Sequence, residues 1–268
     1  MKAILVTNDD GCRSAGFIAL ILELSRENHQ VVGVAPETGR SWIGKAISAH
    51  KKLRIKKMRM QGLEVFMTNG TPADCVQLGV YHLLSSRPLL VVSGINIGLN
   101  IGTARMLSSG TLGATMEATL LGIPSIAVSL MIPSSVRSSL NLYRKQSCGV
   151  FYQASSITSR IVKIIIENQM LGDIGLLSVN IPYGATLESD IEITKPFRAP
   201  YGQLFHKQWG GYIHKTPVIQ FNDMDDDMDD DFDIKAIRNG KISITPVDLS
   251  LVLNEDLIRL RGLLKKHW

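Results

Sequence analysis

Two adjacent carboxylates, Asp9 and Asp10, directly follow a short apolar run near the start of the chain. Two negative charges this close repel each other and raise one pKa, unless a cation lies between them. Hard divalent ions such as Mg²⁺ or Mn²⁺ prefer oxygen ligands of this kind. Asp-Gly is also a common turn signal, so an Asx-turn or a helix cap explains the same residues. The pair is therefore a candidate metal site that still needs further ligands.

A second polar segment, residues 94–102, has the sequence GINIGLNIG, with Asn96 and Asn100 between glycines that recur every four residues. Glycine lets a backbone approach a ligand closely, and asparagine offers a neutral oxygen to a metal. The spacing differs from G-x-G-x-x-G, so the segment does not predict a dinucleotide-binding turn. A flexible loop is the alternative interpretation.

A third segment, Ser108-Ser109-Gly110-Thr111, precedes an expected helix. Backbone N–H groups and hydroxyls at a helix N-terminus form an anion site, although an ordinary serine or threonine N-cap explains the same residues. Asn69-Gly70-Thr71-Pro72 has the same two interpretations. Together the segments outline an acidic metal pair, a neutral amide ligand and a phosphate cradle. No G-x-S-x-G elbow and no Cys/His nucleophile pair competes with them.

These segments need a fold that brings them to one place. Apolar runs at residues 2–6 and 30–35 flank a helical pattern at 16–27, which predicts a βαβ unit, a parallel sheet and a right-handed crossover. Further strands are expected at 63–68, 89–92, 125–129 and 175–179, and further helices at 72–84, 111–121 and 150–168. Ligands bind beyond the carboxyl ends of strands in such sheets. We therefore expect the polar segments to converge there, together with Gly39-Arg40-Ser41 in the irregular stretch 37–52.

The pattern changes after Pro182. Short strand-like pieces at 191–194, 218–221 and 241–245 alternate with loops, and residues 253–266 have a helical pattern. We therefore divide the chain into an α/β, doubly wound body (residues 1–182) and a C-terminal extension (residues 183–268). The extension is too fragmented to form a core alone, so we expect it to pack against a neighbouring subunit.

Composition narrows the class of protein. The 268 residues are 45% hydrophobic and 20% charged, as in globular proteins. No apolar stretch approaches the ~18 residues of a membrane helix, and no basic stripe interleaved with aromatics predicts a nucleic-acid groove. The three cysteines are odd in number and lack metal-ligand spacing, which favours a reduced, cytoplasmic setting.

Charge is unevenly distributed. The formal net charge is +5 although residues 223–233 alone carry eight aspartates, so the rest of the chain is strongly basic. A basic body suits an anionic substrate, and lysines placed for solubility are the alternative. The eight aspartates cannot all be buried, because unpaired buried carboxylates are costly. A solvated loop is the first interpretation of this run and an accessory cation site the second.

Eight segments, in order along nearly the whole chain, resemble the SurE family of survival-protein 5′/3′-nucleotidases. They are VTNDDG (6–11), GRS (39–41), NGTPADCV (69–76), VVSGINIGLNIG (91–102), SSGTLGATMEA (108–118), GIPSIAVS (122–129), VNIP (179–182) and SITP (243–246). The resemblance implies a Rossmann-like, mostly parallel sheet, with C-terminal segments packed between subunits of a homodimer or homotetramer. It also implies hydrolysis of nucleoside 5′- and 3′-monophosphates.

The resemblance further implies roles for individual residues. One divalent metal ion, Mg²⁺ or Mn²⁺, would be held by Asp9, Asp10, Ser41 and Asn96. The phosphate would lie against Asn100, Ser109, Gly110 and Thr111. The catalytic set would comprise Asp9, Asp10, Asn96, Ser109 and Thr111. Hydrolysis would proceed either by attack of an activated water or through an aspartyl-phosphate, and the sequence leaves both routes open.

The chain departs from the family pattern at several positions. The family usually has acidic residues after the position of Gly102, where this chain has Thr103-Ala104-Arg105, and an aromatic residue where this chain has Ser108. These changes affect substrate preference and rate more than reaction type. A catalytically reduced nucleotide-binding protein of the same fold is therefore the alternative function. Asp233 stands at the family's aspartate before SITP, so it is expected to order the C-terminal part rather than only to be solvated.

Overall fold

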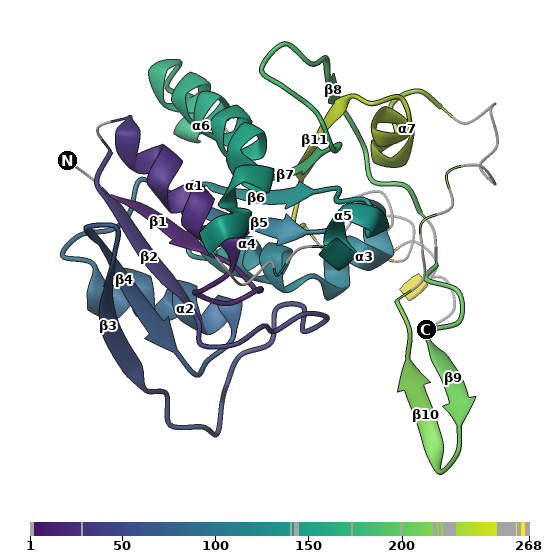
Figure 1. The fold of residues 1–268 in the computed structure, drawn as a ribbon, viewed down its shortest axis with the longest axis horizontal. Helices are drawn as coiled ribbons and strands as arrows, with labels where there is room; N and C mark the ends of the chain where they lie inside the picture. The colour runs from purple at the N-terminus through teal and green to yellow at the C-terminus, as the bar shows by residue number, and fades with distance from the viewer. Residues whose placement is uncertain are drawn as a thin grey trace.

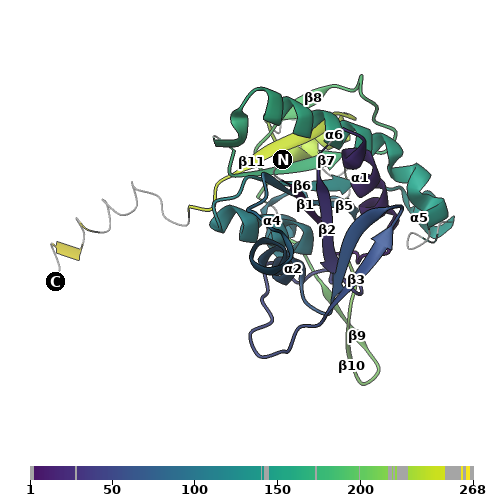
Figure 2. The ribbon, with the colours of Figure 1, turned by 90° about the vertical axis from the view of Figure 1, so that its left-hand side faces the viewer.

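The computed structural model describes residues 3–27, 29–139, 141, 145–172, 174–198, 200–216, 219, 221, 229–250, 261 and 264–265. Its centre is a nine-stranded sheet with the strand order β3-β4-β2-β1-β5-β6-β7-β11-β8. Helices cover both faces of this sheet (Figures 1 and 2). The predicted α/β fold with a mostly parallel sheet is confirmed.

The middle of the sheet is parallel and positions the polar segments. β1 (Ile4–Thr7) pairs in parallel with β2 (Val31–Pro36) on one side and with β5 (Leu90–Ile97) on the other. The chain winds outward from β1 through β2 and then returns to β5 on the opposite side, so the strand order reverses between β1 and β5. Ligands bind at such a switch point. β6 (Ser125–Leu130) and β7 (Leu176–Ile181) continue the parallel part.

Both edges of the sheet contain antiparallel pairs. β3 (Ile55–Met60) and β4 (Leu63–Thr68) form a hairpin at one edge. At the other, β11 (Ile242–Val247) is antiparallel to β7, and β8 (Ile191–Ile193) is parallel to β11. Residues after Pro182 therefore contribute two strands to the same sheet as the body.

The helices form one layer on each face of the sheet. α1 (Ala15–Arg26) and α6 (Tyr152–Glu167) pack against each other on one face, and α2 (Pro72–Leu78) and α4 (Gly110–Leu120) on the other (Figure 2). Side chains alternate between the faces of a strand, and the apolar residues of β1 accordingly belong to two separate buried clusters. The shorter elements are η1 (Gly79–Leu83), α3 (Thr103–Ser108), α5 (Ser134–Ser139), η2 (Lys145–Phe151), η3 (Met170–Gly172) and α7 (Asp233–Arg238).

One predicted boundary is wrong, and one predicted helix changes its type along its length. The polar segment after residue 92 is not simply a loop, because β5 continues to Ile97 and α3 follows at Thr103–Ser108. The helix expected at 72–84 remains α-helical only to Leu78 and then continues as the π-helical η1. The expected strand at 218–221 and the expected helix at 253–266 lie almost entirely outside the described residues.

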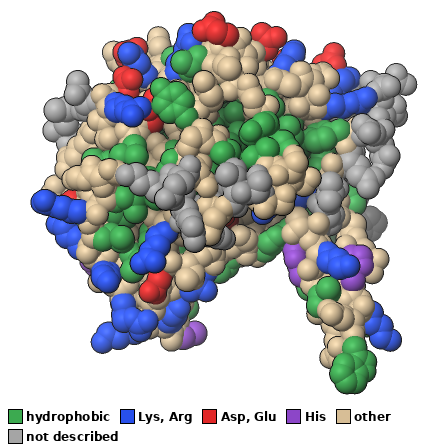
Figure 3. Space-filling model, viewed as in Figure 1, with side chains coloured by type: hydrophobic (Ala, Val, Ile, Leu, Met, Phe, Trp, Pro, Cys, Tyr) green, Lys and Arg blue, Asp and Glu red, His purple; other side chains and the backbone are tan. Residues whose placement is uncertain are grey.

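A β-hairpin that the sequence pattern did not predict extends away from the sheet (Figure 1). It consists of β9 (Phe205–Gln208) and β10 (Gly211–His214). Trp209 at its turn is fully exposed, and Phe205 and Tyr212 are mostly exposed. Figure 3 shows hydrophobic side chains at the tip of this hairpin. An exposed strand pair has no core-facing side, so its sequence lacks the alternation that identifies a half-buried strand.

Asp233 is completely buried and connects the C-terminal part to the body. Its Oδ2 accepts a hydrogen bond from Gly102 N at 2.6 Å, and its Oδ1 accepts one from Phe197 N at 3.1 Å. Gly102 caps α3, so this carboxylate joins two segments far apart in sequence. By contrast, Asp229 and Asp230 are exposed and form ion pairs with Lys195 and Lys235. The predicted difference between Asp233 and its neighbours is confirmed for the described aspartates.

The described residues include no helix that is both long and apolar enough to cross a membrane. All three cysteines are free thiols, and two of them, Cys12 and Cys75, are buried.

Candidate active site

The carboxylates of Asp9 and Asp10 lie in the loop that leads from β1 to α1. Both are buried, with 3% and 8% of their surface exposed. The Thr111 hydroxyl donates a hydrogen bond to Asp9 Oδ1 at 2.7 Å. The backbone N–H of Ile97 donates to Asp10 Oδ2 at 3.2 Å. Groups from α4 and from the end of β5 therefore hold the two carboxylates at the switch point of the sheet.

Keeping both buried carboxylates ionised costs free energy. Burial raises the pKa of Asp9 to about 6, against the hydrogen bonds that Thr111 donates. Burial, together with the charge of Asp9, raises the pKa of Asp10 to about 7. A cation between the carboxylates would relieve both effects. Because the described residues contain no group of three or more Asp, Glu, His or Cys with metal-binding geometry, further ligands would have to be neutral oxygens.

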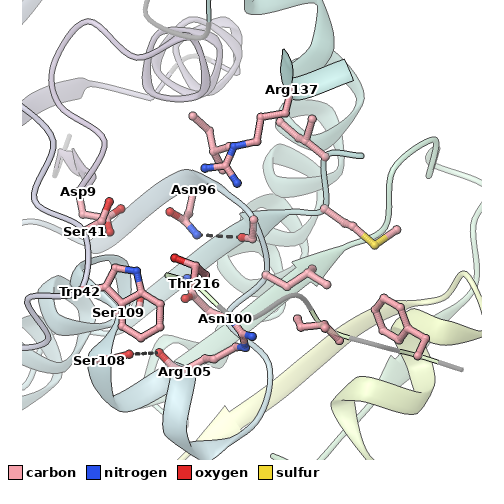
Figure 4. Close-up of a pocket in the computed structure, with 17 residues that line it drawn as sticks. Asp9, Ser41, Trp42, Asn96, Asn100, Arg105, Ser108, Ser109, Arg137 and Thr216 are labelled. Atoms are coloured by element: carbon pink, nitrogen blue, oxygen red, sulfur yellow. Dashed lines mark hydrogen bonds between the residues drawn. The ribbon is translucent and has the colours of Figure 1, made fainter. Parts of the chain in front are cut away.

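A cavity of about 380 Å³ opens beside the Asp9 carboxylate (Figure 4). The predicted site residues that line it are Asp9, Ser41, Asn96, Asn100 and Ser109. The other three, Asp10, Gly110 and Thr111, do not line this cavity, although Thr111 contacts Asp9 directly. The convergence expected from the strand order thus places five predicted residues around one hollow.

A bulge in β5 determines where Asn96 lies. The register between β5 and β6 shifts between Ser93, opposite Ala127, and Asn96, opposite Ser129. A bulge of this kind changes the direction of the side chains that follow it. Gly94 lies inside the bulge with φ +151, and a Cβ there would meet the Val128 carbonyl oxygen at 2.7 Å, so only glycine fits.

The two asparagines are fixed in different ways. The Asn96 amide donates from Nδ2 to the Gly98 carbonyl at 2.8 Å, which leaves its oxygen as the acceptor end of the side chain. Asn100 Nδ2 donates to Ser129 Oγ, and its backbone N–H donates to Asn180 Oδ1, both at 2.9 Å. Asn96 thus offers an oxygen in the cavity that Asp9 also lines, whereas Asn100 is bound to β6 and β7.

The loop that carries Ser41 is held on both sides. The Arg40 N–H donates to the Asp9 carbonyl at 2.6 Å, and the Gly44 N–H donates to the Ser108 carbonyl at 2.9 Å. Lys45 forms an ion pair with the buried Glu117 of α4. The stretch expected to be irregular is therefore irregular but fixed against the end of β1 and against α4.

The N-terminus of α4 faces the carboxylates. Ser109 is the N-cap, and its hydroxyl accepts a hydrogen bond from Leu112 N at 3.2 Å. A Cβ on Gly110 would lie 2.8 Å from the Asp9 Cβ, so the helix begins in direct contact with Asp9. The cap and the anion site are compatible here, because the capping residue Ser109 also lines the cavity.

The other segment with the same two interpretations, residues 69–72, is a helix cap. Thr71 and Asp74 form a reciprocal capping box at the start of α2, with N–O distances of 3.0 and 2.8 Å. Asn69 Oδ1 accepts a hydrogen bond from Arg54 N at 2.8 Å. None of these residues lines the cavity.

The cavity lining also includes Trp42, Arg105 and Arg137, which the sequence did not single out as ligand contacts. Arg105 belongs to the segment where the chain departs from the family pattern, and the structure places it in the cavity wall. Arg137 lies on α5 and opposes the rise in the pKa of Asp10. In the sequence, only the position of Trp42 next to Ser41 indicates that it lies at the site. No sequence feature indicates this for Arg137.

Comparisons with known proteins agree on one family. The family model described as "Survival protein SurE" matches residues 4–203. A relative from Methanocella arvoryzae, named 5′-nucleotidase SurE, is 32% identical over 99% of this chain and 98% of its own length. A relative of the same name from Geobacter metallireducens is 38% identical, with 96% of each chain covered. The solved structure of the SurE protein from Aquifex aeolicus superposes with a TM-score of 0.78 at 29% identity, covering 98% of this chain and 99% of that one.

Proposed function

The chain belongs to the SurE family, and from this premise we propose that it is a 5′-nucleotidase that depends on one divalent metal ion. It releases phosphate from nucleoside 5′-monophosphates and, as a second activity, from 3′-monophosphates. The observation that carries the proposal is the cavity in which Asp9, Ser41, Asn96 and Ser109 meet. This cavity combines acidic and neutral oxygens with a helix N-terminus, which a phosphomonoesterase with a hard metal requires.

The residues present fit Mg²⁺ or Mn²⁺. The carboxylate of Asp9 shares the cavity with the Asn96 amide and the Ser41 hydroxyl, and the buried carboxylate of Asp10 follows it in the same loop, so the donor set is all oxygen. Asp9, Asp10, Ser41 and Asn96 would hold the ion. When bound, the ion supplies positive charge that stabilises phosphoryl oxygens and favours loss of a proton from water.

The residues of the chain orient the two carboxylates and bind the phosphoryl group. Thr111 fixes Asp9 through its hydroxyl, and the Ile97 N–H fixes Asp10. Ser109 and the first turn of α4 stabilise negative charge on the transferring phosphoryl group. Asn100, which is hydrogen-bonded to β6 and β7, contacts the same phosphate from the segment that follows β5. In this arrangement Thr111 acts on the phosphate mainly through the position of Asp9.

Phosphate release from AMP tests the proposed function. The purified protein is expected to hydrolyse AMP in the presence of Mn²⁺ or Mg²⁺, to lose this activity with a chelator, and to regain it when metal is restored. 3′-AMP forms a second arm of the assay. Saturable AMP binding without phosphate release, under every metal condition, would instead support a catalytically reduced nucleotide-binding protein.

The raised carboxylate pKa values predict how stability changes with pH in metal-free protein. Because folding raises the pKa of Asp9 from 3.8 to about 6 and of Asp10 from 3.8 to about 7, protonation favours the folded state. The contribution is fully present below about pH 4 and is lost as pH rises through 6 to 7. Asp10→Asn removes one of these charges. The variant should therefore melt higher than wild type at pH 8, and the difference should shrink at pH 5.

Thermal melting in the presence of a chelator measures this difference, since other carboxylates contribute equally to both proteins. Saturating Mn²⁺ should raise the melting temperature of the wild type at pH 8 more than that of the variant. A melting difference that is the same at pH 5 and pH 8 would contradict the prediction.

A further inference from the structure

Trp42 is next to the proposed metal ligand Ser41, and both side chains line the cavity that contains Asp9 (Figure 4). Its exposed fraction is 37%, so a large part of this aromatic side chain is open to solvent. Consecutive Cα atoms are only ~3.8 Å apart. A ligand that places its reacting group against Ser41 can therefore contact the Trp42 indole with another part of the same ligand molecule.

The backbone at Trp42 is strained. Its φ is +61°, in the left-handed region that glycine adopts freely and that bulky residues rarely adopt. Such residues persist only where the surrounding structure holds them, and they concentrate at ligand sites. Here the hydrogen bonds from Arg40 and Gly44 hold the loop on either side of Trp42. Of the non-glycine residues with positive φ, Trp42 is one that lines the cavity, so here the strain coincides with the candidate ligand site.

Two rings hold the indole in place. The His214 ring centroid is 4.7 Å from that of Trp42 with an interplanar angle of 68°, and the Tyr201 centroid is 5.3 Å away at 57°. Both neighbours are tilted, so neither stacks flat on the indole. The Tyr201 hydroxyl in turn donates to the Ala104 carbonyl. The indole is thus a fixed aromatic wall, and fixing it before binding reduces the entropy lost on binding.

We propose that Trp42 is the stacking surface for the base of the nucleotide and that it determines the preference of the site for nucleotides over other phosphate esters. This inference rests on the proposed function. An indole carries no positive charge and only one N–H donor, so it is a poor ligand for a phosphate, whereas its flat face suits a planar base. Stacking on an aromatic side chain favours any base, because every base has a π-face. Trp42 therefore selects nucleotides as a class rather than one base.

The kinetic consequence is specific. Stacking is made equally in the ground state and the transition state, so its loss raises KM and leaves kcat nearly unchanged. Trp42→Leu keeps a large apolar side chain but removes the aromatic face. It should raise KM for AMP about tenfold, within the range known for base stacking on aromatic residues. Trp42→Phe should restore most of the affinity.

The comparison substrate is ribose 5-phosphate, which has the same phosphate ester and no base. Its kcat/KM should stay within twofold of wild type in Trp42→Leu. Trp209→Leu, the same substitution at the fully exposed turn of the hairpin, is the matched control, and it should leave kcat/KM unchanged for both substrates. Equal losses for AMP and ribose 5-phosphate would show that Trp42 only braces the loop and would overturn the proposal. An unchanged KM for AMP would overturn it as well.

A binding measurement separates this inference from the proposed function. The chain has three tryptophans, so Trp209→Phe/Trp268→Phe leaves Trp42 as the single tryptophan, whose fluorescence can be excited selectively. Adenosine, which has no phosphate, should quench its fluorescence saturably, and ribose 5-phosphate should not. Quenching by adenosine without AMP hydrolysis would contradict the proposed function but support the role of Trp42. AMP hydrolysis without quenching by adenosine would support the proposed function but contradict the role of Trp42.

Discussion

Asp10→Asn is expected to remove nearly all AMP hydrolysis while the protein stays folded. The carboxylate is one of two anionic ligands proposed for the metal, and asparagine replaces it with a neutral amide of nearly the same shape. Loss of a residue that merely supports a metal ligand costs 10–100-fold in metal affinity or activity, so loss of a ligand should cost at least about a hundredfold. The fold should survive because the side-chain oxygen of the introduced asparagine can still accept the hydrogen bond from Ile97 N.

The measurement is kcat/KM for AMP at saturating Mn²⁺, together with thermal melting to show that the variant is folded. Asp190→Asn makes the same change at an exposed aspartate and should retain full activity. Wild-type turnover by Asp10→Asn would show that Asp10 is not a metal ligand.

The convergence of the candidate site could be predicted because it follows from strand order. Asp9 comes after β1 and Asn96 lies at the end of β5, and these two strands are neighbours at the switch point. In a parallel sheet the carboxyl ends of the strands share one edge, so polar residues after different strands meet there. Ser41 and Ser109 reach the same cavity through loop 37–52 and the start of α4.

The direction of individual side chains could not be predicted in the same way. Thr111 stands in the first turn of α4, where its spacing suits a phosphate contact, yet its hydroxyl donates to Asp9 and does not line the cavity. Residues in the first turn point in several directions, and only tertiary packing determines which one faces the ligand. Arg137 reaches the cavity from α5, a helix of six residues that no periodic pattern identifies.

The elements missed in the sequence share a physical cause. β3 has the sequence IKKMRM at the edge of the sheet, and all of its residues are exposed or half-buried. β9 and β10 are almost entirely exposed. Periodicity reveals an element only through its buried face, so strands that bury little leave little pattern. The central strands, by contrast, are buried on both faces and were found as apolar runs.

Gly110→Ala is expected to lower kcat/KM for AMP by about a hundredfold, since a displacement of about 1 Å in a catalytic group costs that much. The added Cβ would lie 2.8 Å from the Asp9 Cβ, 2.9 Å from the Arg40 carbonyl oxygen and 3.1 Å from Asp9 Oδ2. Two of these atoms belong to Asp9 and the third to the loop that carries Ser41. The clash therefore moves two proposed metal ligands relative to each other, and weaker Mn²⁺ affinity should accompany the loss of activity.

The same substitution separates catalytic geometry from helix stability, because alanine is a better helix former than glycine and would by itself favour α4. Gly149→Ala, in the short helix η2, is the matched control: apart from its chain neighbours and the backbone of its own helix, no atom lies within 4 Å of the added Cβ, so activity should not change. Its free energy of unfolding should stay the same or rise by up to about 1 kcal/mol, since alanine restricts the unfolded chain. If Gly110→Ala matched this control in both kcat/KM and Mn²⁺ affinity, the contact between α4 and Asp9 would have no part in positioning the metal ligands.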